Sequence, residues 1–213
     1  MDAATATEPR IVWDMDGTLL DTTGVVPDAF VEALADLGGP AVDRASIVAA
    51  YSLGIPEVIL SHFLGRPLRS GEEESYYRRL SGVPVSPYDG VIDSLRALRS
   101  GNHPITVFTG ASTRAARSLL SAAGIDVDIL IGGDQIAHPK PAPDGLVEAA
   151  RRLDTRPDRL FYLGDAPTDL LTANAAGARS VAVAWGHLYR ADAPADHTLH
   201  RPVDVLGLLR TET

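Results

Sequence analysis

Two aspartates, Asp14 and Asp16, lie two positions apart directly after a short apolar run, Ile11–Trp13. Such a run, followed by the turn residues Gly17 and Thr18, is typical of a buried strand that ends in a loop. Carboxylates this close repel each other unless a cation or a shared proton relieves them. The pair therefore indicates a site that uses a metal ion, a nucleophile and a proton donor.

Other polar groups follow later apolar runs of the same kind. Thr109 ends one run, Lys140 lies in a proline-rich loop after the next, and Asp165 ends a further run with Asp169 four residues on. Lys140 is the only lysine among 19 lysine and arginine residues, and arginine does not replace a compact ammonium group at a tight site. Carboxylates, a hydroxyl and an ammonium are the groups for phosphoryl transfer assisted by a hard cation, for which we expect Mg²⁺.

Strands and helices alternate over most of the chain. This alternation predicts an α/β fold with a mostly parallel, doubly wound sheet. In such a sheet the carboxyl ends of the strands meet at one edge, so the polar groups that follow them should lie together. The predicted strands are 11–13, 104–108, 127–131, 160–163 and 180–184, and the predicted helices are 91–101, 112–123, 146–153, 167–176 and 203–209.

The segment after the first strand has a different pattern, which is helical without a strand signal. We expect residues 1–21 plus 86–213 to form the α/β core, and residues 22–85 to form a small helical cap between hinges at 21–24 and 82–87. Residues 1–9 are expected to be a loose tail. The predicted cap helices are 29–37, 47–51, 57–64 and 76–80.

Composition limits the class of protein. The net charge of −9 argues against a nucleic-acid-binding surface. The absence of cysteine excludes disulfides and thiolate metal sites. No apolar run approaches the roughly 20 residues that span a bilayer. The N-terminus has an acid at Asp2 and no apolar core, so we do not expect it to be a signal peptide. We therefore expect a cytoplasmic enzyme, a monomer or homodimer, that binds a small molecule and neither nucleic acid nor membrane.

The polar groups form four motifs whose order and spacing resemble those of the haloacid dehalogenase-like hydrolases. The resemblance covers nearly the whole chain, from Arg10 to about Leu209, and the helical insertion is similar to the cap of the subfamily that includes phosphoglycolate phosphatases. The motifs are DMDGT (Asp14–Thr18), TG (Thr109-Gly110), Lys140 in HPKPAP, and GDAPTD (Gly164–Asp169).

The chemistry of these groups and the resemblance imply the same roles. Asp14 would attack phosphorus and form an aspartyl-phosphate. Asp16 would protonate the leaving oxygen and then deprotonate water. Thr109, with backbone N–H groups near Gly110 and Ala111, would hold the phosphoryl oxygens.

The remaining positive charges would come from Lys140 and the metal ion. Lys140 would neutralise charge on the phosphate and on Asp14. Mg²⁺ would be held by Asp14, by the backbone carbonyl of Asp16 and by Asp165, with Asp169 as a ligand or as the partner of one.

Two features select a reaction within the family. Asp16 argues against dehalogenation, because displacement of halide needs no acid for the leaving group. The absence of lysine from the cap excludes the Schiff-base chemistry of phosphonate-cleaving relatives. A mutase similar to β-phosphoglucomutase and a non-catalytic binding module stay open. Gly164 and the uncharged loop Ser52–Pro56 favour a hydrolase, and the intact set of chemical groups argues against a degenerate module.

The cap is expected to select the substrate. The hypothesis is that Ser52, with Tyr51 and Leu53, contacts the leaving group, and that Arg66 and Arg69 bind a second anionic group. A simple interhelical loop and solvated arginines would account for the same residues. Phosphoglycolate, a sugar phosphate or another phosphorylated metabolite are all compatible with the sequence.

Overall fold

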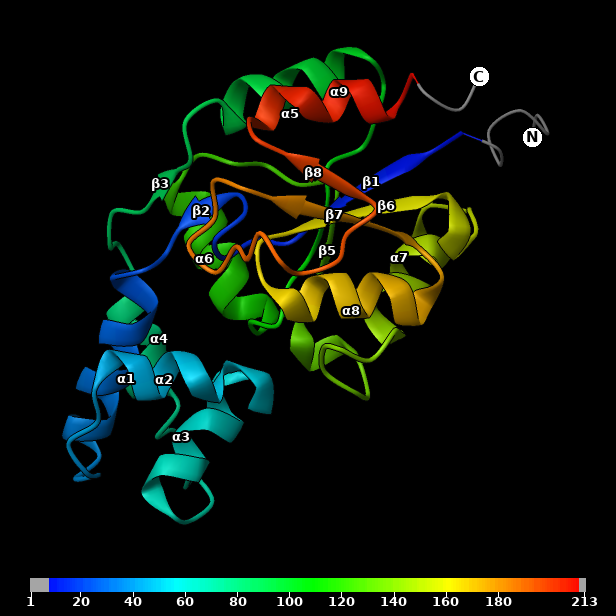
Figure 1. Cartoon of the computed structure of the whole chain (residues 1–213). Helices are drawn as coiled ribbons and strands as arrows, with labels where there is room; N and C mark the ends of the chain where they lie inside the picture. Colours follow the sequence, from blue (N-terminus) through cyan, green and yellow to red (C-terminus); the bar gives the residue numbers. More distant parts are fainter. Residues whose placement is uncertain (1–7, 211–213) are drawn as a thin grey trace.

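The computed structural model describes residues 8–210, so most of the predicted N-terminal tail lies outside the described residues. Figure 1 shows an α/β core and, beside it, a separate group of helices formed by the segment after the first strand. The α/β fold class predicted from the sequence is confirmed.

The core is a six-stranded, wholly parallel sheet in the order β5-β4-β1-β6-β7-β8. β1 lies between β4 and β6, so Asp14 follows a central strand and the ends of its neighbours lie beside it. The strands are β1 (Arg10–Trp13), β4 (Thr106–Phe108), β5 (Ile129–Ile131), β6 (Leu160–Gly164), β7 (Arg179–Val183) and β8 (His197–Leu199).

Helices cover both faces of this sheet, which explains why its central strands are mostly apolar. Ile11 and Trp13 of β1 pack in one cluster with side chains of α5, α6 and α9, whereas Val12 packs in a second cluster with side chains of α7 and α8. The helices are α5 (Val91–Ser100), α6 (Thr113–Ala122), α7 (Asp144–Arg152), α8 (Pro167–Ala176) and α9 (Val205–Leu208).

The cap consists of helices packed around α1. Phe30 of α1 packs against Tyr76 of α4, with their ring centroids 4.3 Å apart. A short antiparallel ribbon, β2 (Leu20–Asp21) with β3 (Ser86–Pro87), pairs the two chain segments that connect these helices to the core. The cap elements are α1 (Val25–Asp36), α2 (Arg44–Ala49), the 3-10 turn η1 (Ala50–Leu53), α3 (Pro56–Leu64) and α4 (Glu74–Leu80).

The structure differs from the sequence prediction mainly near the C-terminus. The predicted helix 203–209 is a 3-10 turn, Pro202–Asp204, followed by the single helical turn α9. β8 was not predicted because its three residues, His-Thr-Leu, have no apolar pattern. This strand forms only through its tertiary pairing with β7.

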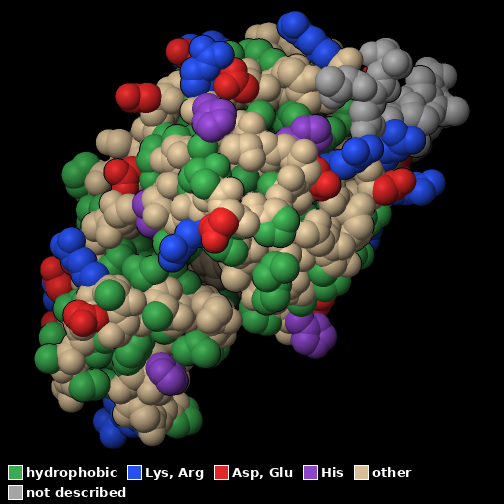
Figure 2. All heavy atoms as spheres, in the orientation of Figure 1, with side chains coloured by type: hydrophobic (Ala, Val, Ile, Leu, Met, Phe, Trp, Pro, Cys, Tyr) green, Lys and Arg blue, Asp and Glu red, His purple; other side chains and the backbone are tan. Residues whose placement is uncertain are grey.

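Between residues 8 and 210, no single helix is long and apolar enough to cross a membrane. Two consecutive helical segments, Arg44–Leu53 and Pro56–Leu64, reach the required length and composition only as a pair, and this pair is bent by 120°. On the face in Figure 2, positive and negative side chains are intermixed over the surface.

Candidate active site

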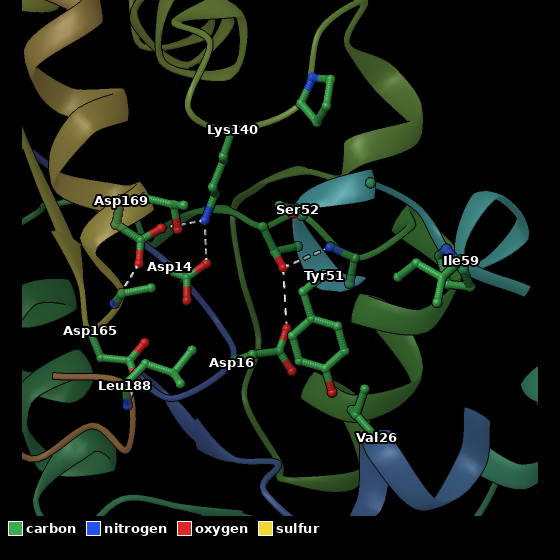
Figure 3. Close-up of a pocket in the computed structure, with 18 of the residues that line it drawn as sticks. Asp14, Asp16, Val26, Tyr51, Ser52, Ile59, Lys140, Asp165, Asp169 and Leu188 are labelled. Carbon is green, nitrogen blue, oxygen red and sulfur yellow. Dashed lines mark hydrogen bonds and ion pairs between the residues drawn. The ribbon is translucent and has the colours of Figure 1, made fainter. Parts of the chain in front are cut away.

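The strand ends and the loops and helices that follow them, together with the turn η1, bring nine of the predicted site residues to one cavity between cap and core. Figure 3 shows Lys140, Asp14, Asp165 and Asp169 at one side of this cavity and Asp16 at the other. The cavity has a volume of about 150 Å³, below the roughly 300–1,000 Å³ of sites for drug-sized ligands. The predicted residues that line it are Asp14, Asp16, Ser52, Thr109, Gly110, Ala111, Lys140, Asp165 and Asp169.

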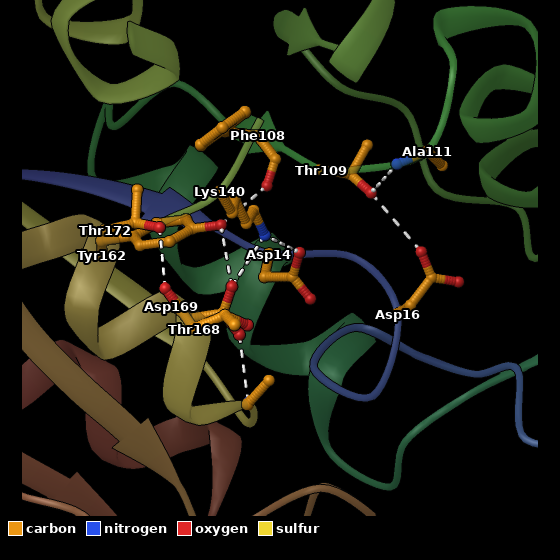
Figure 4. A network of polar contacts seen from close by, with 11 residues as sticks. Asp14, Asp16, Phe108, Thr109, Ala111, Lys140, Tyr162, Thr168, Asp169 and Thr172 are labelled. Carbon is orange, nitrogen blue, oxygen red and sulfur yellow. Dashed lines mark hydrogen bonds and ion pairs between the residues drawn. The ribbon is translucent and has the colours of Figure 1, made fainter. Parts of the chain in front are cut away.

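Lys140 links the end of β1 to the first turn of α8 through two ion pairs (Figure 4). Its Nζ lies 2.6 Å from Asp14 Oδ1 and 2.7 Å from Asp169 Oδ1. Burial alone would lower the pKa of Lys140, but the charges of the two aspartates outweigh burial and raise its pKa above the ordinary value. Lys140 is therefore a permanent positive charge in contact with the side chain of Asp14.

Aromatic rings and further hydrogen bonds hold this lysine and its second partner in place. Lys140 Nζ lies 5.0 Å from the centroid of the Phe108 ring and 5.1 Å from that of Tyr162. The Tyr162 hydroxyl lies 3.0 Å from Phe108 O and 3.3 Å from Asp169 Oδ1, and the Ala166 N–H donates to Asp169 Oδ2 at 3.0 Å. Both oxygens of Asp169 thus have partners within the protein.

Asp165 packs directly against the backbone of two glycines, Gly17 and Gly186. The Leu188 N–H donates to its Oδ2 at 2.8 Å. A Cβ at Gly17 would lie 2.3 Å from Asp165 Oδ2, and a Cβ at Gly186 would lie 2.1 Å from the Cβ of Asp165. Gly17 also has a φ of +78°, which other residues rarely adopt. Glycine is required at both positions for this close approach.

Asp16 faces the start of α6 rather than the lysine. Thr109 Oγ1 lies 3.4 Å from Asp16 Oδ2 and accepts a hydrogen bond from the Ala111 N–H at 3.1 Å. The Ser112 hydroxyl caps α6 by accepting from the Ala115 N–H. The positive end of this helix dipole therefore points toward the cavity, as an anion-binding site requires.

The site contains four carboxyl groups and one ammonium group, and this imbalance perturbs their titration. Burial raises the pKa of Asp14 and of Asp16, in each case against the opposing effect of Lys140. Burial also raises the pKa of Asp165 to about 7. Each of these acids lies in a place where another positive charge would stabilise its ionised form.

The same residues fit a divalent cation of the Mg²⁺ type. Carboxylate oxygens of Asp14, Asp165 and Asp169 lie within 4.8 Å of one another. In the described part of the chain, the buried atoms Asp16 Oδ1 and Asp165 Oδ1 have no hydrogen-bond partner. Such atoms are costly unless an ion or a ligand satisfies them, and Mg²⁺ prefers oxygen ligands.

The cap closes the cavity with an apolar wall. Ser52 lines the cavity as predicted, and so does its neighbour Tyr51. Arg66 does not: its guanidinium is bound to both carboxylate oxygens of Glu72, at 2.6 and 2.9 Å, on the cap surface. Arg69 is likewise outside the cavity. The expectation that these two arginines bind a second anion in this site is therefore wrong for this arrangement of the cap.

Several residues of the site have no signal in the sequence that identifies them. Tyr162 lies within an apolar strand, Gly186 follows another, and each acquires its role from a partner distant in sequence. His187 also lies near the site, with its Nδ1 3.7 Å from Asp165 Oδ2. The cap residues missed are Val26, Phe30, Ile59 and Tyr76.

Known proteins match the chain over this same fold and site. The family profile "haloacid dehalogenase-like hydrolase" matches residues 10–177. The chain is 33% identical over 191 residues to the probable phosphatase IndB of Dickeya dadantii (strain 3937), an alignment that covers 84% of this chain and 82% of IndB. It is 32% identical over 197 residues to the phosphoglycolate phosphatase of Xylella fastidiosa (strain 9a5c), covering 87% and 85%.

A solved structure supports the same assignment. The crystal structure of CbbY from Rhodobacter sphaeroides in complex with phosphate has a TM-score of 0.81 and 25% sequence identity, covering 95% of this chain and 99% of that one. This acidic site, at the carboxyl edge of a doubly wound sheet and covered by a helical cap, is typical of one class of hydrolases. The chain belongs to the haloacid dehalogenase-like hydrolases, in the subfamily of the phosphoglycolate phosphatases.

Proposed function

We propose that this enzyme is a Mg²⁺-dependent phosphatase that hydrolyses a small phosphate monoester through an aspartyl-phosphate. The observation that carries the proposal is the Asp14 carboxylate, held by Lys140 at 2.6 Å in a small cavity whose opposite side carries a second carboxyl group, Asp16. Phosphatases among the relatives support the same reaction. The net charge of −9 supports a small partner rather than nucleic acid, and we place the enzyme in the cytoplasm.

Asp14 is the nucleophile in this mechanism. Lys140 contacts its Oδ1, so Oδ2 is the oxygen left to attack phosphorus. The bond from Asp14 to phosphorus forms while the bond from phosphorus to the ester oxygen breaks, which leaves the phosphoryl group on Asp14. Lys140 offsets the negative charge that collects on the phosphoryl oxygens during transfer.

Asp16 is the acid and then the base. Burial raises its pKa, which favours the protonated form that the first step needs. It donates its proton to the departing ester oxygen and so releases an alcohol. It then takes a proton from the water that attacks the aspartyl-phosphate, and this second step releases inorganic phosphate and restores Asp14.

The phosphoryl oxygens have donors on the other side of the cavity. Thr109 Oγ1 and the backbone around Gly110 and Ala111 lie at the N-terminal end of α6. Donors fixed by a helix start need no rearrangement during the reaction, so they stabilise charge that develops in the transition state.

Asp14, Asp165 and the backbone carbonyl of Asp16 would hold the Mg²⁺ ion, which would supply electrostatic stabilisation of the phosphoryl group. Asp169 has a different task in this proposal. Its two oxygens are bonded to Lys140 and to the Ala166 N–H, so it fixes the position of the lysine. It would act on the ion only through its neighbours.

A mutase similar to β-phosphoglucomutase is less compatible with the site. A bisphosphate substrate needs a second cationic group, and Lys140 is the only cation among the described residues that line the cavity. Mutases of this kind usually have an acidic residue where this chain has Gly164. Such a side chain would not fit here, because a Cβ at that position would lie 2.3 Å from the Cβ of Asp169.

The test is release of inorganic phosphate from 4-nitrophenyl phosphate with and without Mg²⁺. We expect turnover that depends on Mg²⁺, and loss of at least about a thousandfold in kcat for Asp14→Asn. Asp16→Asn should retain formation of the aspartyl-phosphate with this activated ester, and should lose its hydrolysis. An inactive wild-type enzyme would refute the proposal, and full activity of Asp14→Asn would refute the assigned nucleophile.

A further inference from the structure

The cap wall of the cavity is apolar and aromatic. Four of its side chains are at most 8% exposed, and the half-buried Tyr51 lies beside them. Figure 3 shows Tyr51, Val26 and Ile59 on the side of Asp16, away from Lys140. In the proposed mechanism Asp14 takes the phosphoryl group and Asp16 protonates the ester oxygen, so the leaving group occupies the end of the cavity on the side of Asp16. The four buried side chains are Val26, Phe30, Ile59 and Tyr76.

Three aromatic rings of this wall form one continuous surface. The ring centroids of Phe30 and Tyr76 are 4.3 Å apart, and those of Phe30 and Tyr51 are 6.4 Å apart. The rings come from α1, α4 and η1, so the packing of the whole cap fixes their positions. Surfaces of this kind bind apolar and planar groups by burial and by offset or edge contacts.

The cavity has no positive charge for a second anionic group. Among the described residues that line it, Lys140 is the only cation, and it is already paired with Asp14 and Asp169. The cap arginines are used elsewhere: Arg44 pairs with Asp28 and Arg66 with Glu72, both outside the cavity. A carboxylate on the leaving group would lose its hydration here without gaining a partner.

The polar groups that the wall offers to a leaving group include two phenols. Tyr76 is 2% exposed, and within the described residues no hydrogen bond links the hydroxyl of Tyr76 or of Tyr51 to another group. Burial, and then the charge of Asp16, raise the pKa of both phenols, so both keep their protons. They can donate to a neutral acceptor such as a carbonyl or a ring heteroatom.

We infer that the enzyme selects phosphate monoesters whose leaving group is uncharged and carries an apolar or planar ring, and discriminates against esters that bear a second anionic group. This inference rests on the proposed function, because it concerns the same cavity. The inferred substrate preference distinguishes this enzyme from the relative named phosphoglycolate phosphatase, because the leaving group of phosphoglycolate carries a carboxylate.

Two matched pairs of esters test the charge and the ring separately. Ethyl phosphate and phosphoglycolate differ by a methyl group replaced by a carboxylate, and benzyl phosphate and 4-carboxybenzyl phosphate differ by one carboxylate on the ring. We expect kcat/KM to favour the uncharged member of each pair by at least about tenfold, and to favour benzyl over ethyl phosphate by about tenfold.

Two variants connect these preferences to the cap. Tyr51→Ala should lower kcat/KM for benzyl phosphate by about fivefold more than for ethyl phosphate, because only the ring uses the aromatic surface. Ser52→Arg places a guanidinium at the rim from an exposed position. It should raise the ratio of kcat/KM for 4-carboxybenzyl over benzyl phosphate by about fivefold or more. Thermal unfolding checks that both variants are folded.

The outcomes separate this inference from the proposed function. If none of the four esters and no 4-nitrophenyl phosphate is hydrolysed with Mg²⁺, the proposed function fails and the inference fails with it. If esters are hydrolysed and the carboxylated member of either pair is preferred, or the pairs are equal, only the inference is overturned. Equal losses on benzyl and ethyl phosphate in Tyr51→Ala would remove the role of the ring surface.

Discussion

Two aspartates of the same loop acquire different chemistry from their neighbours. Burial raises the pKa of Asp14, but Lys140 at 2.6 Å opposes burial and stabilises the ionised, nucleophilic form. Among the described residues Asp16 has no ion pair: burial raises its pKa against weaker opposing effects of the Thr22 hydroxyl, Lys140 and the Thr109 hydroxyl at 3.4 Å, which favours its protonated form. The two aspartates differ in that only Asp14 is in direct contact with Lys140.

The first prediction separates the structural effect of Lys140 from its chemical effect. Lys140→Met should destabilise the protein by about 3–5 kcal/mol, because it leaves buried carboxylates unpaired. It should also lower kcat/KM at least about a hundredfold. The double variant Lys140→Met/Asp169→Asn removes one of those carboxylates, so it should regain most of the stability and none of the activity. Urea unfolding and steady-state kinetics measure the two quantities, and recovery of activity in the double variant would contradict a direct role for the lysine.

The second prediction concerns Gly186, which the motifs do not include. Gly186→Ala would place a Cβ 2.1 Å from the Cβ of Asp165 and 2.4 Å from Gly17 O, so Asp165 must move. We expect a loss of about 1–3 kcal/mol from overpacking, and at least about a tenfold increase in the Mg²⁺ concentration for half-maximal activity.

The matched control for this substitution is Gly207→Ala in α9. A Cβ at Gly207 meets nothing within 4 Å. It should leave the Mg²⁺ requirement unchanged and stabilise the helix by up to about 1 kcal/mol. If titration of activity with Mg²⁺ gave the same curve for Gly186→Ala as for the wild type, the inferred contact with Asp165 would carry no function.

At the scale of elements, a chain of polar contacts fastens the cap to the core. The Tyr77 hydroxyl of α4 donates to Glu57 Oε1 at 2.6 Å. It also lies 2.9 Å from Oγ of Ser112, the N-terminal capping residue of α6 in the core. Arg114 of α6 lies over the Tyr77 ring at 4.1 Å and pairs with Glu74. These contacts join the helix that carries Tyr76 to the helix whose start faces the phosphoryl group.

The third prediction follows from this contact. Tyr77→Phe retains the ring and removes a hydroxyl whose hydrogen bonds contribute about 1 kcal/mol to the closed position of the cap. We expect KM to rise about fivefold, since substrate binding must then also close the cap. Glu74→Gln changes only the exposed ion pair and should alter KM less than twofold. Steady-state kinetics on one ester test both variants, and an equal effect of the two would contradict the assignment of closure to Tyr77.

The fourth prediction concerns β8, which a carboxylate ties to β7. Asp196 Oδ2 accepts from the N–H and the hydroxyl of Ser180, at 2.8 and 2.9 Å, and the hydrogen bond from the N–H is the main cause of its lowered pKa. A lowered pKa stabilises the fold above the unfolded value near 3.9, and this stability is lost as pH falls through the folded value. Asp196→Asn should therefore reduce the difference in unfolding free energy between pH 6 and pH 3, by about 1 kcal/mol or less because the group is exposed. An unchanged pH dependence in urea unfolding would exclude this contribution.

On the scale of the molecule, the parallel sheet could be predicted because its central strands are apolar runs that end in polar residues. The same rule placed Asp14, Thr109, Lys140 and Asp165 at one edge, where the structure has them. The cap wall could not be predicted, because Phe30 and Tyr76 have the spacing of ordinary core residues. Whether such a residue lines a cavity depends on how α1 and α4 meet the core, which local sequence does not determine.

The whole molecule concentrates negative charge at its centre, and the last prediction follows from this. The carboxylates of Asp14, Asp165 and Asp169 lie within 4.8 Å in a chain of net charge −9, so an ion bound there should stabilise the fold as a whole. At about 100 times its Kd, Mg²⁺ would add about 2.7 kcal/mol, which raises Tm by about 5–10 °C for a chain of this size. Asp165→Asn should reduce this increase to about 1 °C or less, since it removes a charged ligand. Asp93→Asn, at a side chain that is 80% exposed on α5, should retain it in full. Thermal unfolding in EDTA and in Mg²⁺ tests the three proteins, and an equal Mg²⁺ response in Asp165→Asn would mean that the ion stabilises the fold from another site.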